Sequence, residues 1–195
     1  RAGWVASMPD IRISSDSEEY LRLADSLREE RAFARNGRPE TYRTPGYPFF
    51  LFVLQSLGMD SPRGIALAQA GLSAAGVALI FVTADCLDGG PVAWTAAVLL
   101  GAHPTELYSV TSLLSENLFA FLLSVLIWIV VWGGDRRRTA TAFIAGCVTG
   151  IACLARPVVA MLFVPLAGLF GAGGKGTRER LLAGILCLAG GALIQ

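Results

Sequence analysis

Polar and apolar residues divide the chain into two unequal parts. Residues 1–62 hold 17 of the 31 charged side chains, and the remaining 133 residues hold 14. The stretch 14–48 is polar and rich in turn residues, whereas the sequence after it is almost wholly apolar. This pattern predicts one polar region over residues 1–62 and one apolar helical bundle over residues 63–195, rather than two soluble domains.

The polar region is predicted to contain an amphipathic helix that lies at a membrane surface. Ser15 and Glu18 fit a capping box at its start, with Asp16 or Ser17 as alternative caps. The Asn-Gly-Arg-Pro turn at residues 36–39 is expected to end it. Charged residues form its solvent-exposed face, and its apolar positions recur at helical spacing: Tyr20, Leu23, Ala24 and Leu27.

A second short helix is predicted over residues 47–58. This run is apolar but only twelve residues long, whereas about 20 residues are needed to cross a hydrocarbon layer of roughly 30 Å. An interfacial or re-entrant helix fits better than a membrane span, and Gly58 with the Asp-Ser-Pro turn at residues 60–62 would close it.

The apolar part is predicted to cross a membrane several times. Its hydrophobic runs are long enough to span and are separated by short polar or basic loops. The candidate spans are residues 64–87, 91–108, 117–133, the pair 140–155 with 158–171, and a further run that starts at 181.

The basic loops at residues 135–138 and 175–180 give the expected orientation, because short loops rich in Arg and Lys stay in the cytoplasm. Counting the crossings backwards puts residues 106–116 and the polar region 1–62 at the outer face. The same count puts the hairpin that contains Arg156 there. Four charged residues from separate parts of the chain are thus expected on one side of the membrane: Asp16, Arg43, Glu116 and Arg156.

Composition and missing motifs exclude several classes of protein. The chain has 54% hydrophobic and 16% charged residues, against about 25% charged in a typical soluble domain. A net charge of +1 gives no basic field for nucleic acid. The four cysteines lie in apolar stretches without metal-ligand spacing and are expected to be small buried hydrophobic residues. No P-loop, GxGxxG after a strand, HExxH motif or GxSxG elbow is present, so an ATP-driven or dinucleotide-dependent machine is not indicated.

The carboxylates have structural and functional interpretations. Asp16 is either a helix N-cap or a base that takes a proton from an acceptor hydroxyl, whereas Glu18 and Glu19 are interpreted as solvated helix charges. Glu116 sits at or just inside a predicted span, where an ionisable group indicates function unless water or a cap satisfies it. Glu106 is interpreted as a loop charge.

The basic residues also have two interpretations. Arg156 interrupts a long apolar run, and it is either a snorkelling anchor or a guanidinium presented to a lipid phosphate. Arg43 is also interpreted as a guanidinium presented to a lipid phosphate, with Pro45 and Gly46 fixing its backbone near the membrane. His103 is expected to be structural, with metal ligation or proton transfer as the weaker alternative.

Four motifs, in order along the chain, resemble the C-type membrane glycosyltransferases. The closest similarity is to the bacterial branch related to protein O-mannosyltransferases and to the lipid A aminoarabinose transferase. The motifs are DSEEYLRLADSL at 16–27, RTPGYPFFL at 43–51, YSVTSLLSE at 108–116 with Pro104 before it, and GIACLARP at 150–157.

This resemblance implies an all-α polytopic membrane protein, a C-type glycosyltransferase-like helical bundle with amphipathic helices in the first outer loop. Residues 1–62 would be that catalytic loop. The implied reaction transfers a sugar, with inversion, from a polyprenyl-phosphate donor to a protein, lipid or glycan acceptor. Asp16 would be the base and Glu116 a second acidic residue. The residues expected to bind substrate are Arg43, Arg156, Tyr20 and Tyr42.

The expected location is the inner membrane of a bacterium, with the active site facing the periplasm or exterior. No metal ligand is assigned, and a divalent metal is compatible with these residues but not demanded by them. The alternative function is a non-catalytic flippase or transporter of lipid-linked sugars, which would carry its charges near the bilayer midplane. Because Arg1 is not an initiator Met and Gln195 lies in an apolar run, we expect further helices on both sides.

Overall fold

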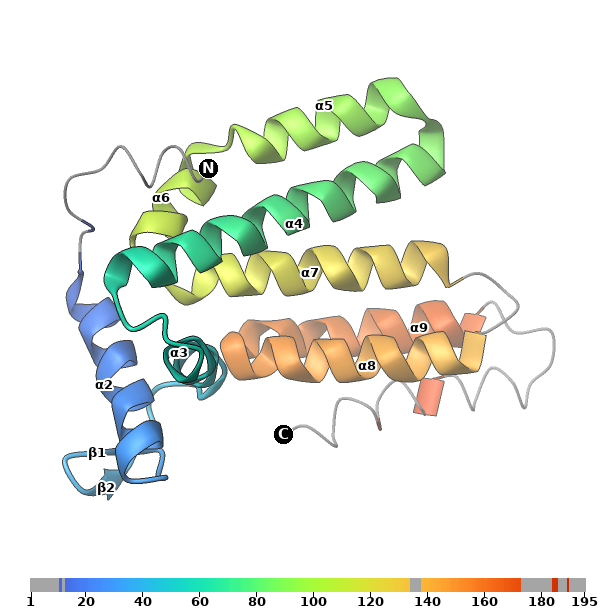
Figure 1. Ribbon diagram of the computed structural model, residues 1–195. Helices are drawn as coiled ribbons and strands as arrows, with labels where there is room; N and C mark the ends of the chain where they lie inside the picture. The colour runs from blue at the N-terminus through green and yellow to red at the C-terminus, as the bar shows by residue number, and fades with distance from the viewer. Residues whose placement is uncertain (1–10, 12, 134–137, 173–183, 186–188, 190–195) are drawn as a thin grey trace.

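The computed structural model describes residues 11, 13–133, 138–172, 184, 185 and 189. Within these residues the protein is helical apart from one two-stranded hairpin. Long helices run side by side, and the short elements α2, α3 and α6 gather at one end of them (Figure 1). That end contains the residues that the sequence analysis selects.

Helix α2, Ser15–Glu29, begins with a capping box made by Ser14 and Ser17. The Ser14 hydroxyl accepts a hydrogen bond from the Ser17 N–H, and the Ser17 hydroxyl accepts one from the Ser14 N–H. The prediction of a box between Ser15 and Glu18 was therefore wrong by one residue, because a serine hydroxyl can take the place of the usual glutamate. The amphipathic pattern is confirmed, since Tyr20, Leu23 and Ala24 are buried.

The predicted end of this helix at residues 36–39 was also wrong. The helix ends at Glu29, and the chain then forms an antiparallel hairpin of β1, Ala34–Arg35, and β2, Arg38–Pro39. Asn36 and Gly37 form its two-residue turn with φ values of 51° and 73°. A hairpin turn with positive φ at both positions favours Asn-Gly, so this dipeptide closes a hairpin rather than a helix.

Helix α3, Gly46–Ser56, confirms the predicted short apolar helix. Its eleven residues extend about 16 Å at 1.5 Å per residue, far less than a membrane crossing. The chain leaves it through Gly58, whose φ is +83°. Tyr47, Leu51 and Leu54 of α3 are buried.

The remaining helices form the bundle. Helices α4 and α7 are long and apolar enough to cross a membrane, and only 33% and 22% of their most apolar windows are buried. Such exposure is typical of helices that face lipid and not of the core of a soluble protein. The elements are α4, Pro62–Asp88; α5, Gly90–Gly101; α6, Pro104–Thr111; α7, Ser115–Trp132; α8, Arg138–Ala155; η2, Pro157–Leu162; and α9, Phe163–Ala172.

Two predicted spans are broken in the structure. The run 91–108 divides into α5 and α6 because Pro104 begins a new helix. A proline disfavours helical backbone in the residue before it, and His103 is extended with ψ of 122°. The run 158–171 begins as the 3₁₀ helix η2 before α9. The basic loops at 135–137 and 175–180 and the start of the run at 181 lie outside the described residues.

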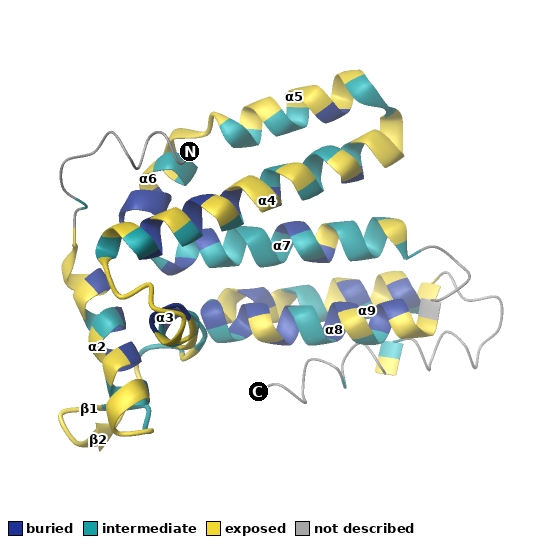
Figure 2. Ribbon diagram, viewed as in Figure 1, coloured by how far each residue is buried: buried dark blue, intermediate teal, exposed yellow. Residues whose placement is uncertain are grey.

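A hydrophobic core joins α2, α3, α4 and α6 at the end of the bundle. Tyr20, Tyr47, Ile65 and Leu113 are among its buried members, and Figure 2 shows most of the buried positions of α4 in the half nearest these elements. Gln69 donates hydrogen bonds to the Tyr47 hydroxyl and to the Leu114 carbonyl. Burial raises the pKa of Tyr47, so its hydroxyl stays neutral. The core therefore provides a rigid support for the charged residues beside it.

Candidate functional site

Arg43 lies between two carboxylates of α2. Its Nη2 donates to Asp16 Oδ1 at 2.6 Å, and its Nε donates to Glu19 Oε2 at 2.9 Å. Asp16 is not the N-cap of α2, because it lies inside the first turn. The structure therefore brings Asp16 and Arg43 into direct contact, and it adds Glu19 as a third member.

A second ion pair joins Glu116 and Arg156. Arg156 Nη2 donates to Glu116 Oε1, and the guanidinium also lies 5.8 Å from the ring centroid of Phe119. Glu116 is in the first turn of α7, and Arg156 is the residue before the 3₁₀ helix η2. Glu116 Oε2 is buried and has no hydrogen-bond partner within the described part of the chain.

Two hydrogen bonds tie the polar region to the bundle beside these pairs. The hydroxyl of Ser17, next to Asp16, donates to the Ser112 carbonyl at 2.6 Å. The hydroxyl of Thr44, next to Arg43, donates to the Ala155 carbonyl at 3.1 Å. These bonds place the start of α2 and the segment before α3 against the helix ends that carry Glu116 and Arg156.

The close approach of α3 to α8 depends on a glycine. A Cβ added to Gly46 would lie 2.5 Å from the carbonyl carbon of Leu154 and 2.6 Å from the nitrogen of Ala155. Because those atoms belong to the backbone, they cannot move aside as a flexible side chain can. Gly46 therefore lets the chain carrying Arg43 pack directly on the end of α8.

A hollow of about 450 Å³ lies between the two arginines, and we name it the arginine hollow. All four residues expected to bind substrate line it, whereas Asp16 and Glu116 do not. The two carboxylates instead hold the guanidiniums that form its polar wall. Its lining residues are Tyr20, Tyr42, Arg43, Thr44, Ser115, Ala155, Arg156, Pro157 and Val158.

Aromatic rings flank Arg43. Its guanidinium carbon lies 5.2 Å from the ring centroid of Tyr20 and 5.5 Å from that of Tyr42. Tyr20 is 8% exposed and Tyr42 is 83% exposed. Tyr20 is therefore a buried part of the wall of the hollow, whereas Tyr42 is a solvent-exposed part of it.

Arg43 keeps its positive charge. Burial by itself lowers the pKa of the guanidinium, but the hydrogen bonds to Glu19 and Asp16 outweigh burial and raise the pKa above its ordinary value. The turn before Arg43 is fixed by Glu40, whose carboxylate accepts the N–H of Tyr42 at 2.7 Å. That hydrogen bond lowers the pKa of Glu40.

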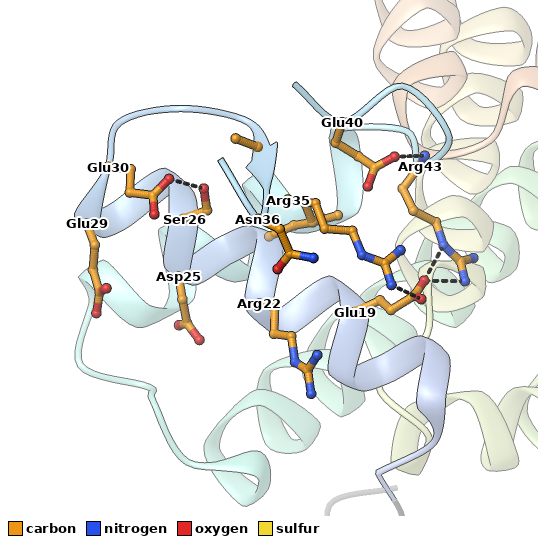
Figure 3. Close-up of a pocket in the computed structure, with 12 residues that line it drawn as sticks. Glu19, Arg22, Asp25, Ser26, Glu29, Glu30, Arg35, Asn36, Glu40 and Arg43 are labelled. Carbon is orange, nitrogen blue, oxygen red and sulfur yellow. Dashed lines mark hydrogen bonds and ion pairs between the residues drawn. The ribbon is translucent and has the colours of Figure 1, made fainter. Parts of the chain in front are cut away.

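Glu19 is the site residue that the sequence analysis missed. It also contacts Arg35 of the hairpin, with Arg35 Nη2 at 3.1 Å from Oε1 (Figure 3). Glu19 and Arg43 line a second hollow of about 310 Å³ between α2 and the hairpin. The three-residue spacing between Asp16 and Glu19 was an available signal, because residues at i and i+3 share one face of a helix.

The described residues include no group of three or more His, Cys, Asp or Glu that could hold a metal ion. His103 is exposed at the start of α6. The cysteines expected to be buried differ from one another, since Cys153 is buried, Cys147 is half-buried and Cys86 is exposed. Cys187 lies outside the described residues.

Comparison with known proteins identifies the family. The family model for dolichyl-phosphate-mannose-protein mannosyltransferase matches residues 42–194, which are most of the chain. No curated protein and no solved structure matches this sequence. The matched range includes Arg43, Glu116 and Arg156, and it begins after Asp16 and Tyr20. The predicted resemblance and the polytopic helical fold are thereby confirmed. The chain belongs to the dolichyl-phosphate-mannose-protein mannosyltransferase family, and it is a membrane glycosyltransferase that uses a lipid-phosphate-linked sugar donor.

Proposed function

We propose that the protein transfers a sugar from a polyprenyl-phosphate donor to an acceptor hydroxyl at the outer face of the membrane, with inversion at the anomeric carbon. The main supporting observation is that Arg43 and Arg156 line one hollow, although they come from opposite ends of the sequence. Two guanidiniums that face the same space form a site for a phosphate, which each can contact through paired N–H groups.

The arginine hollow suits a donor that is polar at one end and apolar at the other. Arg43 and Arg156 supply its charge, while Pro157 and Val158 supply exposed apolar surface at its edge. A lipid phosphate would place its charge between the arginines and its hydrocarbon along that edge. The volume of about 450 Å³ lies within the range of about 300–1,000 Å³ that is usual for small-molecule sites.

Asp16 is the proposed base. The acceptor hydroxyl gives its proton to the Asp16 carboxylate, its oxygen bonds to the anomeric carbon, and the bond from that carbon to the phosphate oxygen breaks. The lipid phosphate leaves with the bonding electrons. Arg43 and Arg156 stabilise the negative charge that develops on it. Because the acceptor attacks opposite the leaving phosphate, the anomeric configuration inverts.

Glu116, the second acidic residue, acts in this proposal through Arg156. The ion pair holds the guanidinium at the wall of the arginine hollow, and Glu116 itself does not line that space. Its Oε2 is buried and has no hydrogen-bond partner within the described residues, so Glu116 contributes to the hollow by holding Arg156. The family's printed name makes mannose and a protein hydroxyl the first substrates to test.

The outer face follows from the orientation expected from the basic loops. The structure is consistent with that orientation, because α2, α3, the start of α7 and the end of α8 lie at one end of the bundle (Figure 1). We further propose a bacterial inner membrane, with residues 1–62 exposed to the periplasm.

The test uses the intact protein in proteoliposomes with radiolabelled polyprenyl-phosphate mannose and an acceptor protein. Asp16→Asn is expected to reduce transfer by at least about 100-fold, because general-base catalysis contributes about 10²–10⁴-fold. Glu18→Gln is the matched control, since Glu18 is on the same helix and pairs only with exposed Arg22 among the described residues. Full activity of Asp16→Asn would reject the assignment. Transbilayer movement of the donor without transfer would favour a flippase.

A further inference from the structure

The guanidinium of Arg43 has two edges, each with two nitrogens that can donate in parallel, and the two edges have different partners. Nε and Nη2 form the side-on edge, and both contact Glu19 Oε2, at 2.9 Å and 2.8 Å. Nη1 and Nη2 form the end-on edge, where Asp16 contacts Nη2 alone at 2.6 Å. Nη1 forms no hydrogen bond or ion pair among the described residues, so half of the end-on edge has no anionic partner.

The two carboxylates also differ in how firmly they are held. Glu19 is 27% exposed and contacts Arg35 through its other oxygen. Asp16 is 54% exposed, and its carboxylate contacts Arg43 only, among the residues described. Solvent screens the more exposed pair more strongly. A competing anion would therefore displace Asp16 and leave Glu19 in place.

We propose that Glu19 is a positioning residue, which together with Arg35 fixes the side-on edge of Arg43 so that the end-on edge receives the donor phosphate. This inference rests on the proposed function of the arginine hollow. When the phosphate binds Nη1 and Nη2, the Asp16 carboxylate is released and becomes free to accept the acceptor proton. The donor therefore binds before Asp16 can act as a base.

The experiment measures how the intact protein, in nanodiscs, binds decaprenyl phosphate, which carries the phosphate but no sugar. Glu19→Gln is expected to raise the Kd at least about tenfold, because Nε and Nη2 of Arg43 lose the anionic oxygen that both of them contact. Glu18→Gln is the matched control and should stay within about twofold, since an exposed pair contributes little. In transfer assays, Glu19→Gln should raise the donor KM more than the acceptor KM.

A double-mutant cycle with Arg43→Lys separates positioning from general loss of structure. Lysine has no side-on edge, so Glu19→Gln should change the Kd by less than about twofold in that background. An unchanged Kd for Glu19→Gln alone, or an equal loss in both backgrounds, would overturn the proposal.

Arg35→Gln provides a second variant in case Glu19→Gln does not fold, and it should weaken binding in the same direction but less. An unchanged Kd for Arg35→Gln would then overturn the proposal. The two proposals also fail in different ways. If the wild-type protein binds decaprenyl phosphate but transfers no sugar, the proposed reaction is rejected and the role of Glu19 is still decided by binding. If sugar is transferred normally and Glu19→Gln binds as the wild type, only the positioning role is rejected.

Discussion

The hydroxyl of Thr44 donates a hydrogen bond to the carbonyl of Ala155, and each of these residues is next to an arginine of the arginine hollow. This one contact joins the polar region to the end of α8. It fixes the relative position of Arg43 and Arg156, although the segments that carry them are far apart in sequence.

Gly46→Ala should damage the junction between α3 and α8. The new Cβ would lie 2.5 Å from the backbone of Leu154, and overpacking of this kind costs about 1–3 kcal/mol. Thermal unfolding of the purified protein should occur at a lower temperature, and donor binding should weaken. Gly71→Ala is the control, since no atom lies within 4 Å of its added Cβ and alanine favours a helix. Equal unfolding temperatures for the two variants would contradict this account of the junction.

Glu116→Gln should weaken the hold on Arg156 and lower kcat/KM for the donor. We expect a loss of about 10-fold or more, because the Arg156 guanidinium loses its anionic partner and keeps only a neutral amide oxygen as acceptor. Glu106→Gln is the control, since Glu106 is in the first turn of α6 and forms no ion pair within the part of the chain that the structure describes. If Glu116→Gln and Arg156→Gln together lose as much as the product of their separate losses, the two residues act independently and the assignment is wrong.

Ser17→Ala should destabilise the folded protein by about 1–2 kcal/mol, because it removes half of the capping box and leaves a buried carbonyl unpaired. The lost contacts are those to the Ser14 N–H and the Ser112 carbonyl. Urea or thermal unfolding of the detergent-solubilised protein measures the effect. Ser56→Ala provides the comparison, since Ser56 is exposed and donates only within its own helix, to Phe52. Similar stability of the two variants would show that the contact with Ser112 contributes little.

Glu40 should make the turn before Arg43 sensitive to acid. Its pKa is lower in the folded protein than its ordinary value, first because it accepts the Tyr42 N–H. A group with a lowered pKa stabilises the fold above its ordinary pKa, and this contribution is lost as the pH falls through the folded pKa. Binding of decaprenyl phosphate should therefore weaken below about pH 4 more in the wild type than in Glu40→Gln. Parallel pH profiles would reject this role.

Hydrophobic length and spacing predicted the parts of the fold that depend on local sequence. The short helix before residue 58 and the long helices α4 and α7 were predictable, because their apolar runs match the membrane or fall well short of it. The break at Pro104 was missed, although proline is a local signal, because the flanking residues form one apolar run. The hairpin at Asn36 and Gly37 was misread as a helix end for a similar reason, since the same residues favour both.

The site was less predictable from sequence than the fold. The charged candidates stood out because placing an ionisable group in or near a membrane costs free energy, and because they lie in motifs that resemble those of the family. The structure brings them to one end of the bundle. Polarity alone does not distinguish Glu19 from Glu18, and the three-residue spacing from Asp16 puts Glu19 on the same helix face without showing which basic residues it contacts. Only the path of the hairpin and of the turn at Glu40 shows that Arg35 and Arg43 converge on Glu19.

The close packing of Gly46 against the end of α8 also affects how the distance between Arg43 and Arg156 depends on the bilayer. If α8 is displaced along its length as a rigid helix in a thicker or thinner membrane, we expect Arg156, which directly follows it, to move with it. Because the chain at Gly46 packs on the Leu154 and Ala155 backbone, we expect Arg43 to move in the same direction. We therefore expect the distance between the two guanidiniums to be independent of bilayer thickness. The affinity for the lipid phosphate should then be the same in thin and thick bilayers.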